Sequence, residues 1–304
     1  MPFERLPWDA DTWFTDVQMF RQPEFGAIYL IDDEKTALVE TGTSNDVHMI
    51  LAALKAFGRT PADVDALLVS HIHLDHAGGA GFLLDAMPNA TVYVHERGAK
   101  HLADPSRLLA SAAQALQDQA DAFGTMRPVP ADRLVAVTEG DTLDLGSRVL
   151  TFHDSPGHAP HELTISDGKN GCVYTGDAAG LWFPRDRLLM PITPAPSFDL
   201  EQNLAVFTRL LKAKPRALLF SHYGPHPEPP AALEQQLVQY SLWASFVRAR
   251  KKEATPERII DELFETHCKG AAFYPERFLK ERIQTSVHGL LAYHQRLEDA
   301  APRG

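Results

Sequence analysis

The chain has 304 residues, 44% of them hydrophobic, and a formal charge of −11. This composition is that of a folded globular protein and excludes a disordered or fibrous chain. There is no apolar run long enough to span a bilayer, and residues 1–21 lack the apolar stretch of a secretory signal, so we expect a cytoplasmic protein with no membrane partner. The acidic balance disfavours general binding to nucleic acid, because phosphates repel an acidic surface.

Short apolar runs alternate with helical patterns through the first three quarters of the chain, which predicts an α/β domain. Residues 27–30 and 37–39 are predicted strands, and a helix with one apolar face follows them. Residues 66–69 form a short buried strand that ends at Ser70 and His71. Residues 101–123 are predicted to be a helical insertion, which could serve as a lid. Residues 141–145 and 149–153 are further predicted strands.

Asp199 is predicted to cap a helix whose buried stripe is Leu200, Leu204, Phe207 and Leu211, and a strand at 217–220 follows. A cluster of prolines at 225–230 then marks the clearest boundary, because neither a helix interior nor a central strand accommodates it. We therefore expect a catalytic domain at 1–226 and a helical region at 227–304. Three helices are predicted there, at 231–252, 256–267 and 275–299, and their apolar stripes suit packing on the main body or a homodimer interface.

The strongest chemical signal is a cluster of metal-binding side chains directly after the buried strand at 66–69. It consists of His71, His73, Asp75 and His76, with two glycines behind them that would let the backbone turn tightly. Four polar side chains in six residues are costly to bury unless they coordinate an ion. Imidazole and carboxylate ligands together suit zinc, iron or manganese.

Three further donors follow predicted strands downstream: His158, Asp177 and His222. The six residues that end at His222 also repeat the pattern that ends at His71, so two buried strands each lead into a histidine. Ligands of layered α/β folds commonly lie at such strand ends. The two cysteines, Cys172 and Cys268, are neither spaced as a metal pair nor numerous enough for a disulfide framework.

This ordered series of motifs, from about residue 25 to 224, resembles the metallo-β-lactamase superfamily, in its hydrolase branch related to glyoxalase II. The resemblance implies a four-layer αβ/βα sandwich, here with a C-terminal helical extension, and two divalent metal ions, zinc before iron or manganese. It implies that His71, His73 and His158 hold the first ion, and that Asp75, His76 and His222 hold the second. Asp177 would bridge them. The oxygen-reducing iron branch carries glutamate at the position of His73, which favours a two-metal hydrolase.

A hydrolase of this kind would use hydroxide formed from a water shared by the two cations, and Asp75 would orient that nucleophile and accept a proton. Glu40 matches an acidic turn found early in the family and is interpreted as a supporting residue beside the ligands. His161 and Tyr223 neighbour proposed ligands. Each is either a hydrogen-bond donor to substrate or a supporting or solvent-exposed residue.

Three functions remain open at this stage. The favoured one is hydrolysis of a small thioester, ester or lactone in a pocket shaped by residues 101–123 and the C-terminal helices. Glyoxalase II carries Gly-His-Glu-Tyr at its last ligand, whereas this chain has Ser221, His222, Tyr223 and Gly224 there. This departure argues against glutathione as part of the substrate. The second is a phosphodiesterase or ribonuclease that uses the basic stretch at 248–252, although cations at a helix end also have a structural explanation. The third is a metal-binding scaffold without catalysis. The β-lactam-cleaving branch is set aside, because the chain has neither an export signal nor a suitably placed cysteine.

Overall fold

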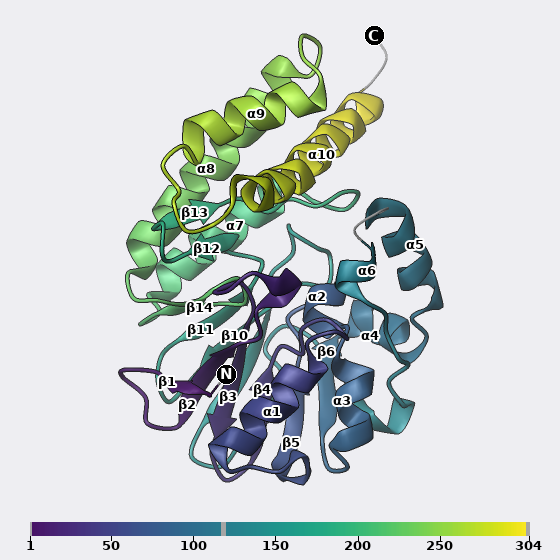
Figure 1. The fold of residues 1–304 in the computed structure, drawn as a ribbon, viewed down its shortest axis with the longest axis vertical. Coiled ribbons are helices and arrows are strands. Elements are labelled where there is room, and N and C mark those ends of the chain that lie inside the picture. The colour runs from purple at the N-terminus through teal and green to yellow at the C-terminus, as the bar shows by residue number, and fades with distance from the viewer. Residues whose placement is uncertain (1, 117–119, 302–304) are drawn as a thin grey trace.

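The structure, a computed structural model, describes residues 2–116 and 120–301 and consists of two β-sheets packed face to face with helices outside them (Figure 1). The strands of the seven-stranded first sheet lie in chain order: β1 (Glu4–Arg5), β2 (Thr12–Asp16), β3 (Ala27–Asp32), β4 (Thr36–Val39), β5 (Val64–Leu68), β6 (Thr91–His95) and β7 (Leu134–Val137). The six-stranded second sheet has the order β15 (Gly224–His226), β14 (Leu218–Phe220), β11 (Val173–Gly176), β10 (Leu163–Asp167), β9 (Val149–Asp154) and β8 (Thr142–Asp144). A ribbon of β12 (Leu181–Phe183) and β13 (Leu188–Met190) lies outside both sheets.

The helices fall into two groups along the chain. The first group flanks the sheets: α1 (Val47–Phe57), α2 (Leu74–Ala77), α3 (Ala80–Ala86), α4 (Glu96–Ala103), α5 (Ser106–Leu116), α6 (Ala120–Phe123) and α7 (Leu200–Ala213). The second group forms the upper part of Figure 1: α8 (Pro229–Arg250), α9 (Pro256–His267) and α10 (Glu276–Ala300). The expected four-layer sandwich with a C-terminal helical extension is confirmed.

Both faces of the central strands are covered, and β3 shows how the sequence achieves this. Tyr29 and Ile31 point into the core between the two sheets, whereas Ile28 and Leu30 pack into the second core beneath the helices. Because side chains alternate across a strand, a strand buried on both sides must be an almost continuous apolar run. This is why the short apolar runs of the sequence predict strands without alternation.

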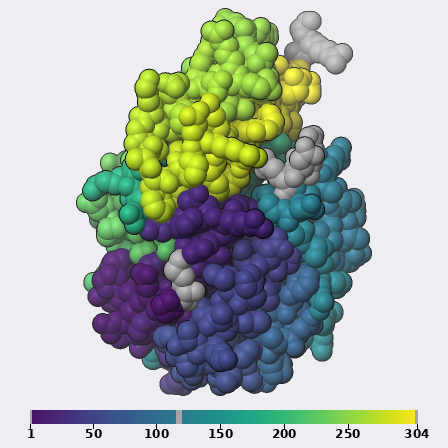
Figure 2. Space-filling view, viewed as in Figure 1, coloured from purple at the N-terminus to yellow at the C-terminus, as the bar shows by residue number. Residues whose placement is uncertain are grey.

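The C-terminal helices contribute side chains to the same hydrophobic core as the first sheet and its helices, so they pack on the rest of the protein. On the face seen in Figure 2, the yellow C-terminal residues lie directly against the dark purple N-terminal segment. One of the contacts is a hydrogen bond from Tyr274 Oη to the carbonyl oxygen of Glu24, at 3.0 Å. The proline cluster fits the rules for proline, because Pro225 lies in the edge strand β15 and Pro229 opens α8. The division at residue 226 stays a prediction.

Two expectations are refined. The helix after Asp199 forms, and the Asp199 side chain accepts a hydrogen bond from the amide of Gln202, but its fully buried side chains are Asn203, Val206, Phe207 and Leu210. The predicted leucines at 200, 204 and 211 only flank that face. Asn203 is accommodated because its amide donates to the carbonyl of Ala178, at 2.9 Å, so an apolar stripe alone did not identify the buried face.

The insertion at 101–123 is helical but broken into the end of α4, then α5 and α6, and residues 117–119 lie outside the described residues. Its role as a lid stays a prediction. Cys172 and Cys268 are both buried, and they form no disulfide with each other. No helix in the described part of the chain is long and apolar enough to cross a membrane.

Candidate metal centre

Five of the seven predicted donors come from turns at one edge of the two sheets, and the other two, Asp75 and His76, come from the short helix α2 at the same edge. β5 of the first sheet leads into the turn with His71, and β14 of the second sheet leads into His222. Two backbone hydrogen bonds join the sheets here, from the amide of Ala27 to Ser221 and from the amide of Leu163 to Ser70, both at 2.8 Å. The edges of the sandwich therefore bring donors from distant parts of the chain to one place.

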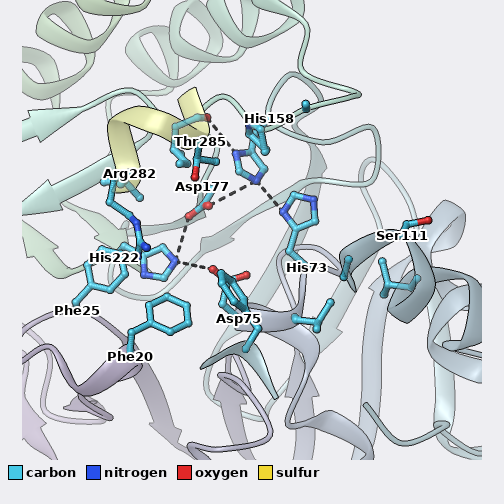
Figure 3. A pocket seen from close by; sticks show the side chains of 18 of the residues that line it. Phe20, Phe25, His73, Asp75, Ser111, His158, Asp177, His222, Arg282 and Thr285 are labelled. Atoms are coloured by element: carbon cyan, nitrogen blue, oxygen red, sulfur yellow. Dashed lines mark hydrogen bonds and ion pairs between the residues drawn. The ribbon is translucent and has the colours of Figure 1, made fainter. Parts of the chain in front are cut away.

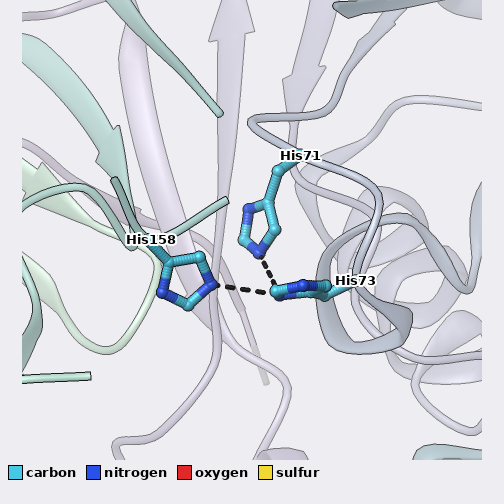
Figure 4. A group of neighbouring side chains, drawn as sticks. All are labelled: His71, His73 and His158. Atoms are coloured by element: carbon cyan, nitrogen blue, oxygen red, sulfur yellow. Dashed lines mark hydrogen bonds between the residues drawn. The ribbon is translucent and has the colours of Figure 1, made fainter. Parts of the chain in front are cut away.

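The first group of donors consists of three imidazoles (Figure 4). Nδ1 of His73 lies 2.9 Å from Nε2 of His71 and 3.0 Å from Nε2 of His158. Burial lowers the pKa of all three imidazoles, that of His73 to about 3, so they are neutral at physiological pH. Neutral imidazole is the form that coordinates a metal ion.

The second group contains Asp75, His76 and His222. Nε2 of His222 lies 3.2 Å from Nε2 of His76 and 3.6 Å from Oδ2 of Asp75. Burial works against ionisation of Asp75, but the adjacent imidazoles of His76 and His222 outweigh it and hold the pKa of this carboxyl well below its usual range. The carboxylate is therefore available as a ligand.

Asp177 lies between the two groups (Figure 3). Its Oδ2 is 3.5 Å from Nε2 of His158 and 3.6 Å from Nε2 of His76, and its Oδ1 is 3.8 Å from Nε2 of His222. The Oδ1 atom is buried and has no hydrogen-bond partner in the described structure. A carboxylate that reaches both groups is positioned to serve two ions at once.

The donor set fits divalent metal ions. Bond lengths of about 2.0–2.1 Å in a tetrahedral zinc site place two ligand nitrogens about 3.3 Å apart, close to the 2.9–3.2 Å between the imidazole nitrogens here. All donor atoms of each group lie within 4.8 Å of one another. Buried imidazole nitrogens that face one another instead of water are expensive unless they coordinate an ion. The residues therefore suit divalent metal ions, and imidazole with carboxylate does not select one metal.

Two buried glutamates orient the imidazoles from behind. Oε1 of Glu40 lies 3.2 Å from Nδ1 of His76, and Oε2 of Glu162 lies 3.1 Å from Nδ1 of His71. In both rings the opposite nitrogen faces the donor cluster, so each glutamate fixes which nitrogen is free to bind an ion. Glu40 is thus a supporting residue, as interpreted from the sequence. Glu162 was missed, although its position four residues after His158 was a usable signal.

Replacing Glu162 with glutamine should weaken metal binding about 10–100-fold, because the His71 ring loses the carboxylate that orients it. Glu162 also accepts a hydrogen bond from the amide of Asp177, at 2.9 Å, which glutamine can preserve. Titration with a chelating indicator measures the affinity of each ion. Glu139→Gln, a change at a half-exposed carboxylate paired with His153, serves as control. Equal affinities in both variants would contradict the orienting role of Glu162.

Gly78 and Gly79, where the sequence led us to expect a tight turn, are required for close packing instead. Gly79 has ordinary helical angles, with φ of −77°, and a Cβ on it would collide with the carbonyl oxygen of Thr41. Gly176, which precedes Asp177, is required both for its backbone conformation and for close packing. Its φ of +53° lies in the left-handed region, and a Cβ would strike the carboxylate of Glu162.

A cavity of about 250 Å³ opens beside the donors, and His73, Asp75, His158, Asp177 and His222 line its floor (Figure 3). Leu108, Ser111, Ala112 and Phe123 of the insertion form one wall, and Arg282 and Thr285 of α10 form another, so both expected segments shape the pocket. His161 and Tyr223 are not among the described residues that line it. Tyr223 packs against Phe14 instead, with ring centroids 6.1 Å apart.

Comparison with known proteins shows which family the sequence of the chain matches. The family profile described as "Metallo-beta-lactamase superfamily" matches residues 21–222, well over half of the chain. The chain is 27% identical over 207 residues to the metallo-beta-lactamase fold-containing protein ST1585 of Sulfurisphaera tokodaii, covering 66% of this chain and 74% of that protein. It is also 27% identical over 173 residues to a nitric oxide reductase of Moorella thermoacetica, but this match covers 54% of this chain and only 38% of the reductase.

Two solved structures support the fold. The crystal structure of ST1585 superposes with a TM-score of 0.69 at 23% identity, covering 88% of this chain and 93% of that one. The metallo-beta-lactamase family protein TTHA1429 of Thermus thermophilus gives a TM-score of 0.68 at 21% identity, covering 92% of this chain and 91% of that one. At these identities the likeness establishes the arrangement of sheets and helices and does not identify a substrate.

Proposed function

The chain belongs to the metallo-beta-lactamase superfamily, and on that premise we propose that it hydrolyses a small thioester, ester or lactone at a centre of two divalent metal ions, zinc in the first place. Metal-dependent hydrolysis is the typical activity of this superfamily. The observation that carries the proposal is the complete donor set: five imidazoles and two carboxylates, in two groups linked by Asp177, beside a cavity. We also propose that the protein belongs to the branch of the superfamily related to glyoxalase II.

His71, His73 and His158 would hold one ion, Asp75, His76 and His222 the other, and Asp177 both. When bound, the ions supply an activated water and an electrophile that polarises the substrate's carbonyl. Hydrolysis joins the water oxygen to the acyl carbon, breaks the bond from that carbon to sulfur or oxygen, and transfers a proton to the departing thiol or alcohol. Asp75 lines the cavity, and its ionised carboxylate can orient the water and relay that proton to the leaving group.

The cavity argues for a small substrate with an apolar body. Its volume of about 250 Å³ lies at or below the lower end of ordinary ligand pockets. Apart from the donors, its lining is mostly Leu, Ile, Ala, Pro and Phe side chains. Apolar walls bind an acyl chain because they exclude water from it. The small volume of the cavity leaves little room for a polymer.

The alternative of a nuclease gains no support from the basic stretch at 248–252. Arg250 forms ion pairs with Glu253 and Glu262, and Lys251 pairs with Glu298 at 2.6 Å. Two of its four cations are therefore already engaged with carboxylates of the C-terminal helices. Their positions suit the end of α8, where cations complement the helix dipole.

A substrate panel tests the proposal. Initial rates are measured with an acyl thioester, a lactone and a phosphodiester, on protein loaded separately with zinc, manganese and iron. We expect turnover of a carbonyl substrate that disappears in His158→Ala, because one imidazole of the first group is lost. Turnover of the phosphodiester alone would instead favour the nuclease. Absence of turnover on every class with each metal would contradict a hydrolase of these substrates.

A further inference from the structure

Arg282 of α10 is a buried cation in the wall of the cavity (Figure 3). The residue is only 8% exposed, and its guanidinium carbon lies 4.7–5.5 Å from the ring centroids of Phe20, Phe25 and Phe278. Phe25 also stacks on the ring of His222, with centroids 4.4 Å apart. The guanidinium therefore shares an aromatic neighbour with a predicted metal ligand.

Two carboxylates of the described part of the chain, those of Glu281 and Asp75, lie near enough to favour the charge of Arg282, but neither accepts a hydrogen bond from it. Its one ion pair there joins Nη2 to Oε2 of Glu281, at 3.5 Å, and no hydrogen bond from its guanidinium is formed. Glu281 is shared, since its Oε1 accepts a hydrogen bond from Arg277 at 3.1 Å. A guanidinium has five N–H donors, and those of Arg282 that reach the cavity are free to bind an anion there.

We propose that Arg282 binds a carboxylate carried by the substrate at a distance from the bond that is hydrolysed. The substrate class is then a small acyl thioester, ester or lactone with a free carboxylate on its acyl chain, and this inference rests on the proposed function. A carboxylate matches the planar fork of a single guanidinium. A phosphate dianion calls for more donors, and Arg282 is the one Arg or Lys among the described residues of the wall.

Arg282 could instead have a purely structural role, in which its guanidinium only packs against the three phenylalanine rings. Other contacts, however, already hold α10 in place. The Ser286 hydroxyl donates to the carbonyl of Pro191 at 2.9 Å, and the Thr193 hydroxyl donates to the carbonyl of Ser286 at 2.8 Å. Gly289 lets the helix approach Thr193 so closely that a Cβ would collide with its carbonyl oxygen. Removing the guanidinium should therefore leave the wall of the cavity standing.

A matched pair of substrates tests the proposal on the full-length, metal-loaded protein. Glutaryl and pentanoyl thioesters of N-acetylcysteamine have the same number of acyl carbons and differ in one terminal carboxylate. We expect the KM of the wild type to be at least about 10-fold lower for the glutaryl thioester. Arg282→Gln should raise that KM about 10–100-fold with little change in kcat, and should change the pentanoyl KM less than about 3-fold.

Two variants control the experiment. Arg282→Lys keeps the charge and should restore part of the preference for the glutaryl thioester. Arg277→Gln removes a cation from the same helix, next to the same Glu281, at a side chain that is 92% exposed, and should leave the preference unchanged. Equal KM values for the two thioesters in the wild type, or an equal rise for both in Arg282→Gln, would overturn the proposal.

A binding measurement separates failure of this inference from failure of the proposed function. If neither thioester is turned over, calorimetric titration with glutarate is carried out on the same metal-loaded proteins. If glutarate binds at least about 10-fold more weakly to Arg282→Gln than to Arg277→Gln, the carboxylate site at Arg282 is supported even though the proposed hydrolysis is wrong. Equal binding in the two variants would reject the carboxylate site.

Discussion

Replacing Asp177 with alanine is expected to empty both ion sites together and to lower kcat/KM by at least about 100-fold. The reason is geometric, since the two carboxylate oxygens of Asp177 lie 3.5–3.8 Å from imidazole nitrogens of both groups. Loss of a residue that only supports a ligand costs about 10–100-fold, so loss of a shared ligand should cost at least as much. Elemental analysis of the desalted protein measures the number of ions per chain.

The control is Asp85→Ala, which removes an exposed carboxylate that pairs with Arg127. This variant should keep the ion content and activity of the wild type. If Asp177→Ala loses one ion and retains the other at full occupancy, Asp177 serves one site and is not a bridge. Unchanged content of both ions would remove any ligand role.

The donors of the proposed centre could be predicted from the sequence because local chain features place them. His71 and His222 each follow a buried strand, and the edge of the sandwich brings the ends of such strands together. His73, Asp75 and His76 then follow from their spacing within one turn and the short helix α2. The positions of these donors depend on residues close to them in the sequence. Sequence patterns are informative over such short separations.

Arg282, the proposed carboxylate-binding residue in the cavity wall, could not be predicted in the same way. Arg282 lies sixty positions beyond His222 on a long helix with several other charged residues, and nothing local distinguishes it from Arg277. Its burial depends on how α10 packs against Thr193 and the phenylalanines of the N-terminal segment. Such contacts arise only when distant parts of the chain meet. A proposal about substrate preference therefore needs the structure, whereas a reaction class can be proposed from the sequence motifs.

Replacing Arg148 with methionine is expected to lower the free energy of unfolding by about 3–5 kcal/mol, the cost of leaving buried carboxylates without their cation. The side chain of Arg148 is fully buried, and its nitrogens lie 2.6 Å from Asp167, 3.1 Å from Asp9 and 3.1 Å from Asp33. Asp33 lies in the turn between β3 and β4, at the far end of β4 from Glu40. The cluster thus joins the sheets at the end opposite the metal centre, and the variant should keep its ions while it remains folded.

Lys169→Met provides the matched control, because Lys169 pairs with Asp11 at 2.6 Å but is 35% exposed, and a solvent-exposed pair contributes at most about 1 kcal/mol. Chemical denaturation of the three proteins at neutral pH measures the difference. Equal losses in the two variants would show that the buried cluster is no more important than a surface pair.

The same cluster sets the expected response to acid. Burial alone would raise the pKa of Asp9 and Asp33, but hydrogen bonds outweigh it: those from Thr12, Asn170 and Arg148 hold the pKa of Asp9 well below 3.8, and those from Ser147 and Arg148 lower that of Asp33 to about 2. A carboxyl with a depressed folded-state pKa stabilises the protein above its unfolded pKa, and this stabilisation is lost as pH falls through the folded value. The free energy of unfolding should therefore decline between about pH 5 and pH 2. In Arg148→Met this decline should be shallower, because the cation that favours both carboxylates is gone; an unchanged slope would mean that Arg148 does not control their ionisation.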